Sequence, residues 1–320
     1  ESRPGPSIFG GISMGRWTRR GLLTGAGIAA GALGTRALYS SKVPHGLSFP
    51  VDMGSSGTLL NDAGELSPTK VAKHVVLNGN PDEALLTALR AELAEAKVAG
   101  RGLVASTARH SMGGQSLLAD GVALTLDQPF IEPNAAAKTY RVAAGTRWST
   151  VIRELDKIGF SPAVMQSNND FGVASTYSVN AHGWPVAFSG GGTTVRSMKM
   201  LLADGQHVNC SPTENADLYG FAMGGYGMFG IITELEMDMV PNSRLDPTYT
   251  TMPGKDFGEA FLKAIRDNPD IQMAYGRMDV TIDGFFDEAL MITYKPNADQ
   301  SDIPAAAGSG FISKISRDIF

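Results

Sequence analysis

The succession of strands and helices from residue 71 onward constrains the fold more than any other feature of the sequence. Val71 to Leu77 has the apolar character of a buried strand, and Asn80-Pro81-Asp82-Glu83 is typical of a helix start. The helix carries leucines on one face and is expected to end near Gly100, before a second strand at Gly102 to Ser106. The sequence therefore predicts a β-α-β unit.

The alternation continues after this unit. Strands are expected at Val122 to Leu126 and Tyr140 to Ala144, and a helix is expected at Ser149 to Ile158 with Val151, Ile152 and Leu155 facing inward. Strands and helices joined by short links indicate an α+β or α/β nucleotide-binding domain.

Charge and cysteine content exclude several classes of function. The 320 residues hold 27 Lys+Arg and 32 Asp+Glu, a formal charge of −5 without a basic block, so nucleic acid is not expected as a partner. The single cysteine, Cys210, rules out an intramolecular disulfide, and the five histidines lack the spacing of metal ligands. No metal site is predicted.

The first 41 residues are expected to be a targeting signal. Arg19 and Arg20 precede an uncharged run from Gly21 to Leu33, which is shorter than the roughly 20 apolar residues that span a bilayer. Thr18-Arg19-Arg20-Gly21-Leu22-Leu23 is similar to a twin-arginine export signal, which predicts a periplasmic or extracellular protein that uses the twin-arginine machinery. A basic tail before a small helix and an uncleaved membrane anchor are the alternatives.

Four segments beyond the predicted linker (42–68) combine glycine with small polar residues, as ligand-binding loops do. In order they are Ser106 to Gln115, Gly145 to Trp148, Gln166 to Gly183 and Met223 to Thr233. The first follows a buried strand, where successive backbone N–H groups can surround an anion. The third is long, polar and short of helix formers, so it is expected to be either a ligand loop or a disordered insertion.

The four segments, together with a predicted strand pair and Asp-Gly turn at Thr194 to Gly205, resemble the FAD-binding domain of the vanillyl-alcohol oxidase superfamily. The resemblance covers roughly Val71 to Pro241 and is nearest to aldonolactone and alditol oxidases and decaprenylphosphoryl-ribose oxidase. It implies an α+β fold, with a two-subdomain PCMH-type FAD-binding domain at 69–242. The start of an antiparallel-sheet substrate domain would follow at 243–320.

The resemblance also implies which residues contact FAD. The turn from Ser106 to Ser111 would surround the diphosphate, and other matched positions would contact the rest of the cofactor. The full set is Ser106, Thr107, Ala108, Arg109, His110, Ser111, Gly113, Gly145, Ser167, Asn168, Gly172, Ser175, Val179, His182, Gly183, Gly227, Gly230 and Ile232.

Two histidines have alternative interpretations. His110 falls where covalent relatives attach the flavin 8α-methyl group to a histidine nitrogen, but it could instead form only a hydrogen bond within a loop that binds FAD non-covalently. His182 matches a residue near the isoalloxazine ring, but it could be an ordinary core histidine. In two places the sequence departs from relatives, which usually have glycines at Ala174-Ser175 and at Thr107 or Ala108, and these side chains could shift the cofactor.

Two other motifs suggest different functions. Gly225 to Gly230 fits G-x-G-x-x-G, but a helical run precedes it and a strand pattern follows, which is the reverse of a Rossmann site. His110 to Gly114 is similar to a nucleophile elbow, with Ser111, Asp170 and His182 in the chain order of a serine hydrolase. Against that, Arg109 stands where the elbow requires glycine, and no long helix follows.

After Pro241 the sequence predicts a helix at Phe257 to Arg266 and strands at Gln272 to Val280 and Ala289 to Thr293. Tyr275, Arg277 and Asp279 alternate on one strand, which gives it a polar face. Relatives continue well beyond this point, so the chain is expected to be a fragment whose catalytic residues lie beyond Phe320.

The sequence thus predicts an exported FAD-dependent oxidase or dehydrogenase that acts on CH–OH groups. A polyol, sugar or sugar lactone would transfer hydride to the flavin, and oxygen or another acceptor would reoxidise it. A non-catalytic flavin or carbohydrate binder and a serine hydrolase that uses Ser111 are the alternatives.

Overall fold

The computed structural model describes residues 57–111, 113–301 and 303, which belong to one compact unit. The predicted export signal and most of the predicted linker lie outside these residues. Within the described residues, no helix combines the length and apolar character needed to span a membrane.

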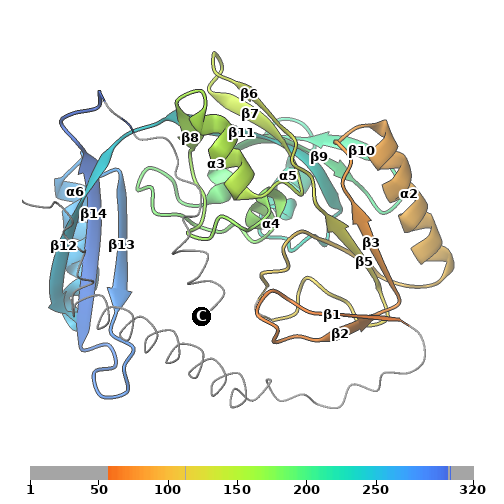
Figure 1. The fold of residues 1–320 in the computed structure, drawn as a ribbon, viewed down its shortest axis with the longest axis horizontal. Helices are drawn as coiled ribbons and strands as arrows, with labels where there is room; N and C mark the ends of the chain where they lie inside the picture. The colour runs from red at the N-terminus through yellow and green to blue at the C-terminus, as the bar shows by residue number, and fades with distance from the viewer. Residues whose placement is uncertain (1–56, 112, 302, 304–320) are drawn as a thin grey trace, which may run out of the picture. The chain divides into compact units, whose positions relative to one another are not determined.

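The N-terminal β-α-β unit forms as predicted. Strands β3 (Lys73–Leu77) and β4 (Leu103–Ser106) lie on either side of β5 (Val122–Leu126), and both run parallel to it. Helix α2 (Glu83–Val98) begins where the Asp82 side chain accepts hydrogen bonds from the N–H groups of the first turn. Leu85 and Leu89 of α2 are buried in the same core as Leu124 of the middle strand. Figure 1 shows α2 beside β3. The unit holds β4, and therefore the loop after it, on a rigid support.

A two-stranded sheet begins within the predicted linker (42–68) and ends just after it. β1 (Thr58–Leu60) pairs with β2 (Thr69–Val71), and Val71 is fully buried. The turn between them contacts the loop after β4, because the Ala63 N–H donates to the Arg109 carbonyl at 2.8 Å. This turn therefore supports the first of the predicted ligand loops.

A six-stranded antiparallel sheet forms the second half of the domain. Its spatial order is β10-β9-β11-β7-β6, with β8 also paired to β11. The strands are β6 (Ile131–Asn134), β7 (Thr139–Ala143), β8 (Phe160–Pro162), β9 (Val195–Leu201), β10 (His207–Cys210) and β11 (Ile231–Pro241). The predicted Asp-Gly turn does join β9 to β10, and Arg90 of α2 donates to the Gly205 carbonyl at 3.0 Å.

Three helices accompany this sheet: α3 (Trp148–Asp156), α4 (Val173–Ser178) and α5 (Ala216–Ala222). The segment from Gln166 to Gly183, predicted to be a ligand loop or a disordered insertion, contains helix α4, although its sequence has weak helix propensity. Tertiary packing decides its structure, because Val173 and Tyr177 are buried and the Trp148 indole N–H donates to Thr176 Oγ1 at 2.8 Å.

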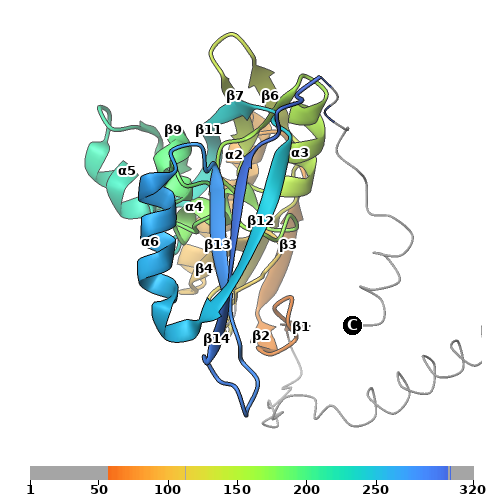
Figure 2. The ribbon, with the colours of Figure 1, turned by 90° about the vertical axis from the view of Figure 1, so that its left-hand side faces the viewer.

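A three-stranded antiparallel sheet follows, in the order β12-β14-β13. Its strands are β12 (Leu245–Pro253), β13 (Met273–Met278) and β14 (Glu288–Pro296), and α6 (Phe257–Asp267) packs beside them (Figure 2). A Cβ on Gly276 would lie only 2.1 Å from the Phe257 ring. The absence of a side chain at Gly276 therefore allows the Phe257 ring to pack directly on the backbone of β13. The predicted α+β class with antiparallel sheets after the FAD-binding region is therefore confirmed, although β12 was not predicted.

Candidate functional site

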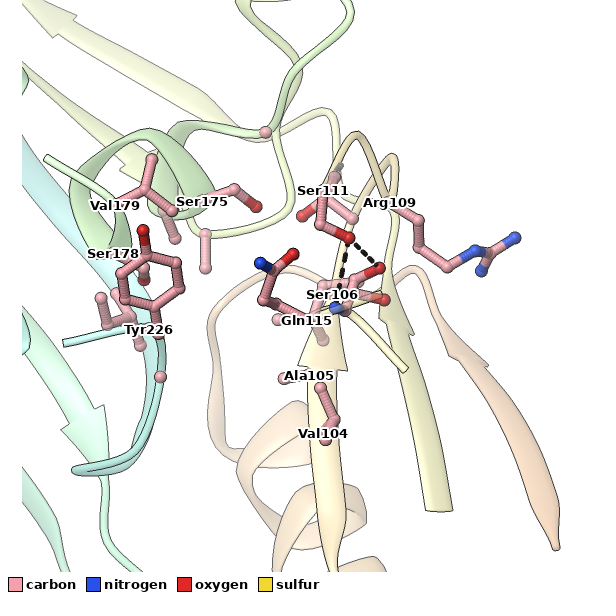
Figure 3. Close-up of a pocket in the computed structure, with 18 of the residues that line it drawn as sticks. Val104, Ala105, Ser106, Arg109, Ser111, Gln115, Ser175, Ser178, Val179 and Tyr226 are labelled. Atoms are coloured by element: carbon pink, nitrogen blue, oxygen red, sulfur yellow. Dashed lines mark hydrogen bonds between the residues drawn. The ribbon is translucent and has the colours of Figure 1, made fainter. Parts of the chain in front are cut away.

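A cavity of about 510 Å³ opens where β4, the loop after it, α4 and the start of β11 meet (Figure 3). Its size is within the range of small-molecule sites. Its walls come from parts of the chain that are far apart in sequence: β4 and the loop after it, α4, and the 223–230 segment with the start of β11. The cavity is a product of the tertiary fold.

The loop after β4 forms one wall, and its backbone is suited to an anion. From Ala108 to Ser111 no backbone N–H donates to a partner within the described part of the chain. Arg109 has φ +53°, the left-handed conformation that helps turn successive N–H groups toward one side. Such a concavity favours a phosphate group.

The Arg109 side chain points away from the cavity (Figure 3). Its guanidinium donates to the Asn61 carbonyl at 2.9 Å and to Thr125 Oγ1 at 3.1 Å. Thr125 Oγ1 also lies 2.9 Å from His74 Nε2, within hydrogen-bond distance. Burial lowers the pKa of His74, and the nearby positive charge of Arg109 lowers it further. Arg109 therefore holds the loop from behind, and only its backbone faces the cavity.

Close packing joins the first and third predicted loops. A Cβ on Gly172 would lie 2.6 Å from Thr107 Oγ1, so the Thr107 side chain fills the space that this glycine leaves. Thr107 is one of the departures from the family pattern. Its added atoms therefore pack against Gly172.

The opposite wall is more apolar. Tyr226 and Met228 from the glycine-rich segment, with Val179 at the end of α4, line the cavity and remain largely exposed. Tyr226 has φ +52°, and its N–H donates to the Ser178 carbonyl at 2.9 Å, which fixes this strained residue at the cavity edge. Gln115 lies across from the Tyr226 ring (Figure 3).

The structure brings twelve of the eighteen predicted residues to this cavity. They are Ser106, Thr107, Ala108, Arg109, His110, Ser111, Gly172, Ser175, Val179, Gly227, Gly230 and Ile232. It places the other six outside the cavity lining: Gly113, Gly145, Ser167, Asn168, His182 and Gly183.

The six have other surroundings. A Cβ at Gly145 would meet the Leu126 carbonyl at 2.5 Å, and one at Gly183 would meet the Met165 carbonyl at 2.4 Å, so both glycines permit close backbone packing. His182 is exposed, which also excludes the core-histidine interpretation.

The sequence did not single out several cavity residues individually. Val104, Ala105, Gln115, Ser178, Tyr226 and Met228 all line the cavity. Most of them lie in or beside predicted segments, but which strand and loop side chains enter the cavity depends on how the two sheets meet.

The contacts of Ser111 do not form a hydrolase triad. Ser111 Oγ lies 2.8 Å from Ser116 Oγ and accepts a hydrogen bond from the Ser116 N–H, while Asp170 pairs with His110. Among the described residues no hydrogen bond joins Ser111 to a histidine, so no nucleophile–base pair is present.

The arrangement fits FAD. Loop N–H donors without a partner among the described residues suit the diphosphate, and an apolar cavity edge with an exposed tyrosine suits a flat ring. FAD bound here would supply a hydride acceptor, and the residues that line the cavity would hold and orient it.

Comparison with known proteins agrees with this assignment. Residues 86–211 match the family described as FAD binding domain. The chain is 33% identical over 100 residues to a putative D-arabinono-1,4-lactone oxidase of Neurospora crassa. This match covers 31% of the chain and 18% of that protein.

Two further relatives match longer stretches. An alditol oxidase of a Streptomyces species is 30% identical over 143 residues, which is 43% of this chain and 34% of the relative. Cytokinin dehydrogenase 9 of rice is 29% identical over 142 residues, which is 42% of this chain and 27% of the relative. The matches thus span no more than about a third of these curated relatives. They show that residues 86–211 are similar to the family described as FAD binding domain, and that part of the chain is similar to these oxidases and dehydrogenases.

Proposed function

We propose that the protein is an exported FAD-dependent oxidoreductase that oxidises a hydroxyl-bearing carbon of a polyol, sugar or sugar lactone. The observation that supports it most is the cavity, which combines backbone N–H groups at 108–111 that have no partner among the described residues with an apolar edge at Tyr226, next to residues similar to an FAD binding domain. The names of two relatives, an alditol oxidase and a lactone oxidase, favour this substrate class.

Within this proposal the described residues bind and position the cofactor. The loop from Ser106 to Ser111 holds the diphosphate, and His110 is the point of covalent attachment. Residues 243–320 form the start of the substrate domain. Cell fractionation followed by N-terminal sequencing would test export, because a protein found only in the cytoplasm with residues 1–41 intact would contradict it.

The visible spectrum of the purified full-length protein tests the redox function. We expect a yellow protein whose flavin absorption is bleached by a sugar alcohol or an aldonolactone without oxygen and restored by air. Because a cytokinin dehydrogenase is also a relative, a cytokinin belongs in the same panel. A yellow protein that nothing bleaches would indicate a flavin binder, and a colourless protein would overturn the proposal.

A further inference from the structure

His110 and Asp170 come from two different loops and meet at the cavity wall. His110 Nε2 lies 2.8 Å from Asp170 Oδ2, and the His110 side chain is 24% exposed. The His110 ring also packs on Phe171, with ring centroids 4.5 Å apart. These two contacts fix the orientation of the imidazole.

Asp170 is itself held in place. The Arg147 guanidinium donates to the Asp170 carbonyl at 2.8 Å and lies 3.6 Å from Asp170 Oδ1. The Asp170 N–H donates to Asn168 Oδ1 at 2.9 Å. Although the Asp170 side chain is largely exposed, its backbone is anchored on both sides, so the carboxylate stands at a defined position beside His110.

This pairing determines which nitrogen of His110 is nucleophilic. A carboxylate only accepts hydrogen bonds, so Nε2 must carry the proton, and in the neutral ring the lone pair is then on Nδ1. His110 lines the cavity, and its Nδ1 has no hydrogen-bond partner among the described residues. The ring is thus an oriented nucleophile with one free nitrogen.

We propose that Asp170 is the positioning residue for covalent attachment of FAD through His110 Nδ1, an inference that rests on the attachment included in the proposed function. The Nδ1 lone pair forms a C–N bond to the 8α-methyl carbon, and one methyl C–H bond breaks. The proton goes to solvent, and the two electrons enter the isoalloxazine ring. Molecular oxygen takes these electrons with two protons and leaves as hydrogen peroxide.

Charge explains why a carboxylate is needed at this position. Once Nδ1 is alkylated while Nε2 keeps its proton, the His110 imidazole carries a positive charge. The Asp170 carboxylate, 2.8 Å away, neutralises it. An amide at the same place could still accept the Nε2 hydrogen bond but could not balance the charge.

The test compares full-length wild type with Asp170→Asn, Asp170→Glu and His110→Ala. Each protein is purified and precipitated with acid, and flavin fluorescence is measured on the denatured chain and in the supernatant. Asp170→Asn should lower the covalently attached share of the bound flavin by about tenfold or more, while FAD stays bound non-covalently. Asp170→Glu should restore most of the attachment, and His110→Ala should abolish it. Asp217→Asn, an exposed acid on α5, is the matched control.

The linked nitrogen gives a second readout. NMR of the flavin peptide from wild type should show attachment through Nδ1. A link through Nε2, or full attachment in Asp170→Asn, would overturn the positioning role. Wild type that releases all its FAD in acid but is still bleached by substrate would refute attachment and leave the redox function intact, whereas a protein without flavin would refute both. If Asp170→Asn does not fold, as judged by circular dichroism, the Nδ1 assignment in wild type and the Asp170→Glu result decide the question.

Discussion

At the scale of single residues, the site depends on positions where a side chain is missing or turned away. Gly172 leaves the space that Thr107 occupies, and Arg109 supports its loop from the side opposite the cavity. Neither role follows from residue type, since a sequence alone presents Arg109 as a natural phosphate ligand. The loop backbone, whose N–H groups at 108–111 have no partner among the described residues, is the part suited to an anion.

Gly172→Ala is expected to weaken FAD binding and to lower the free energy of unfolding by about 1–3 kcal/mol. The new Cβ would lie within 2.6–2.8 Å of three Thr107 side-chain atoms, so the first and third loops must separate. FAD titration and urea denaturation would measure both effects. Gly258→Ala, on α6 with open space around the glycine, is the control and should be neutral or stabilising. Equal behaviour of the two variants would show that the Gly172–Thr107 contact is unimportant.

At the scale of elements, a buried acid on the central strand of the antiparallel sheet forms ion pairs with both neighbouring strands. Glu234 of β11 is 5% exposed, and it pairs with Arg141 of β7 at 2.7 Å and with Lys199 of β9 at 3.1 Å. Burial opposes its ionisation, but the hydrogen bonds from Arg141 and Lys199 outweigh burial, so the pKa of Glu234 lies below its usual range. One carboxylate thus connects three neighbouring strands, of which β11 also leads into the cavity.

Glu234→Gln should lower the free energy of unfolding at pH 7 by about 1–3 kcal/mol, because hydrogen bonds to a charged group are lost. Since the folded-state pKa is depressed, the stabilisation is complete above the unfolded pKa near 4.3 and disappears as the pH falls through the folded pKa. The difference between wild type and variant in urea denaturation should therefore shrink from about pH 5 downward. Glu259→Gln, at an exposed position on α6, should show no such trend. A difference that stays constant with pH would exclude the ion pairs as the cause.

At the scale of the whole described unit, a short stretch after Gly183 connects the FAD-binding domain to the C-terminal sheet. The Val186 N–H donates to the Gln272 carbonyl and the Ala274 N–H donates to the Trp184 carbonyl, so this stretch adds to the edge of β13. The Trp184 ring stacks on Tyr275 with centroids 4.2 Å apart, and Arg277 lies 5.9 Å from the Tyr275 ring centroid. The sequence predicts that Tyr275 and Arg277 share a polar strand face, but it does not predict this aromatic contact.

Trp184→Ala should destabilise the C-terminal sheet by about 1–3 kcal/mol, because both the stack and its buried area are lost. Hydrogen exchange of β13 amides should accelerate while that of β5 amides stays unchanged. Trp184→Phe should keep part of the protection. Phe285→Ala, at an exposed ring in the β13–β14 connection, is the control for losing an aromatic side chain from the same sheet. Unchanged β13 exchange in Trp184→Ala would show that the stack does not stabilise the sheet.

The sequence by itself determined the elements whose signals are local. Apolar strands at 122–126 and 231–240, the Asp82-capped helix and the Asp-Gly turn at 204–205 all follow from short-range pattern and turn chemistry, and they appear where they were predicted. The order of the glycine-bearing segments was enough to identify the FAD-binding domain. Only the tertiary structure decided that α4 is helical, that Arg109 turns outward and that Tyr226 and Gln115 face the cavity. These features depend on contacts between segments distant in the chain, because weak local propensities and side-chain directions are settled by the packing of one sheet against the other.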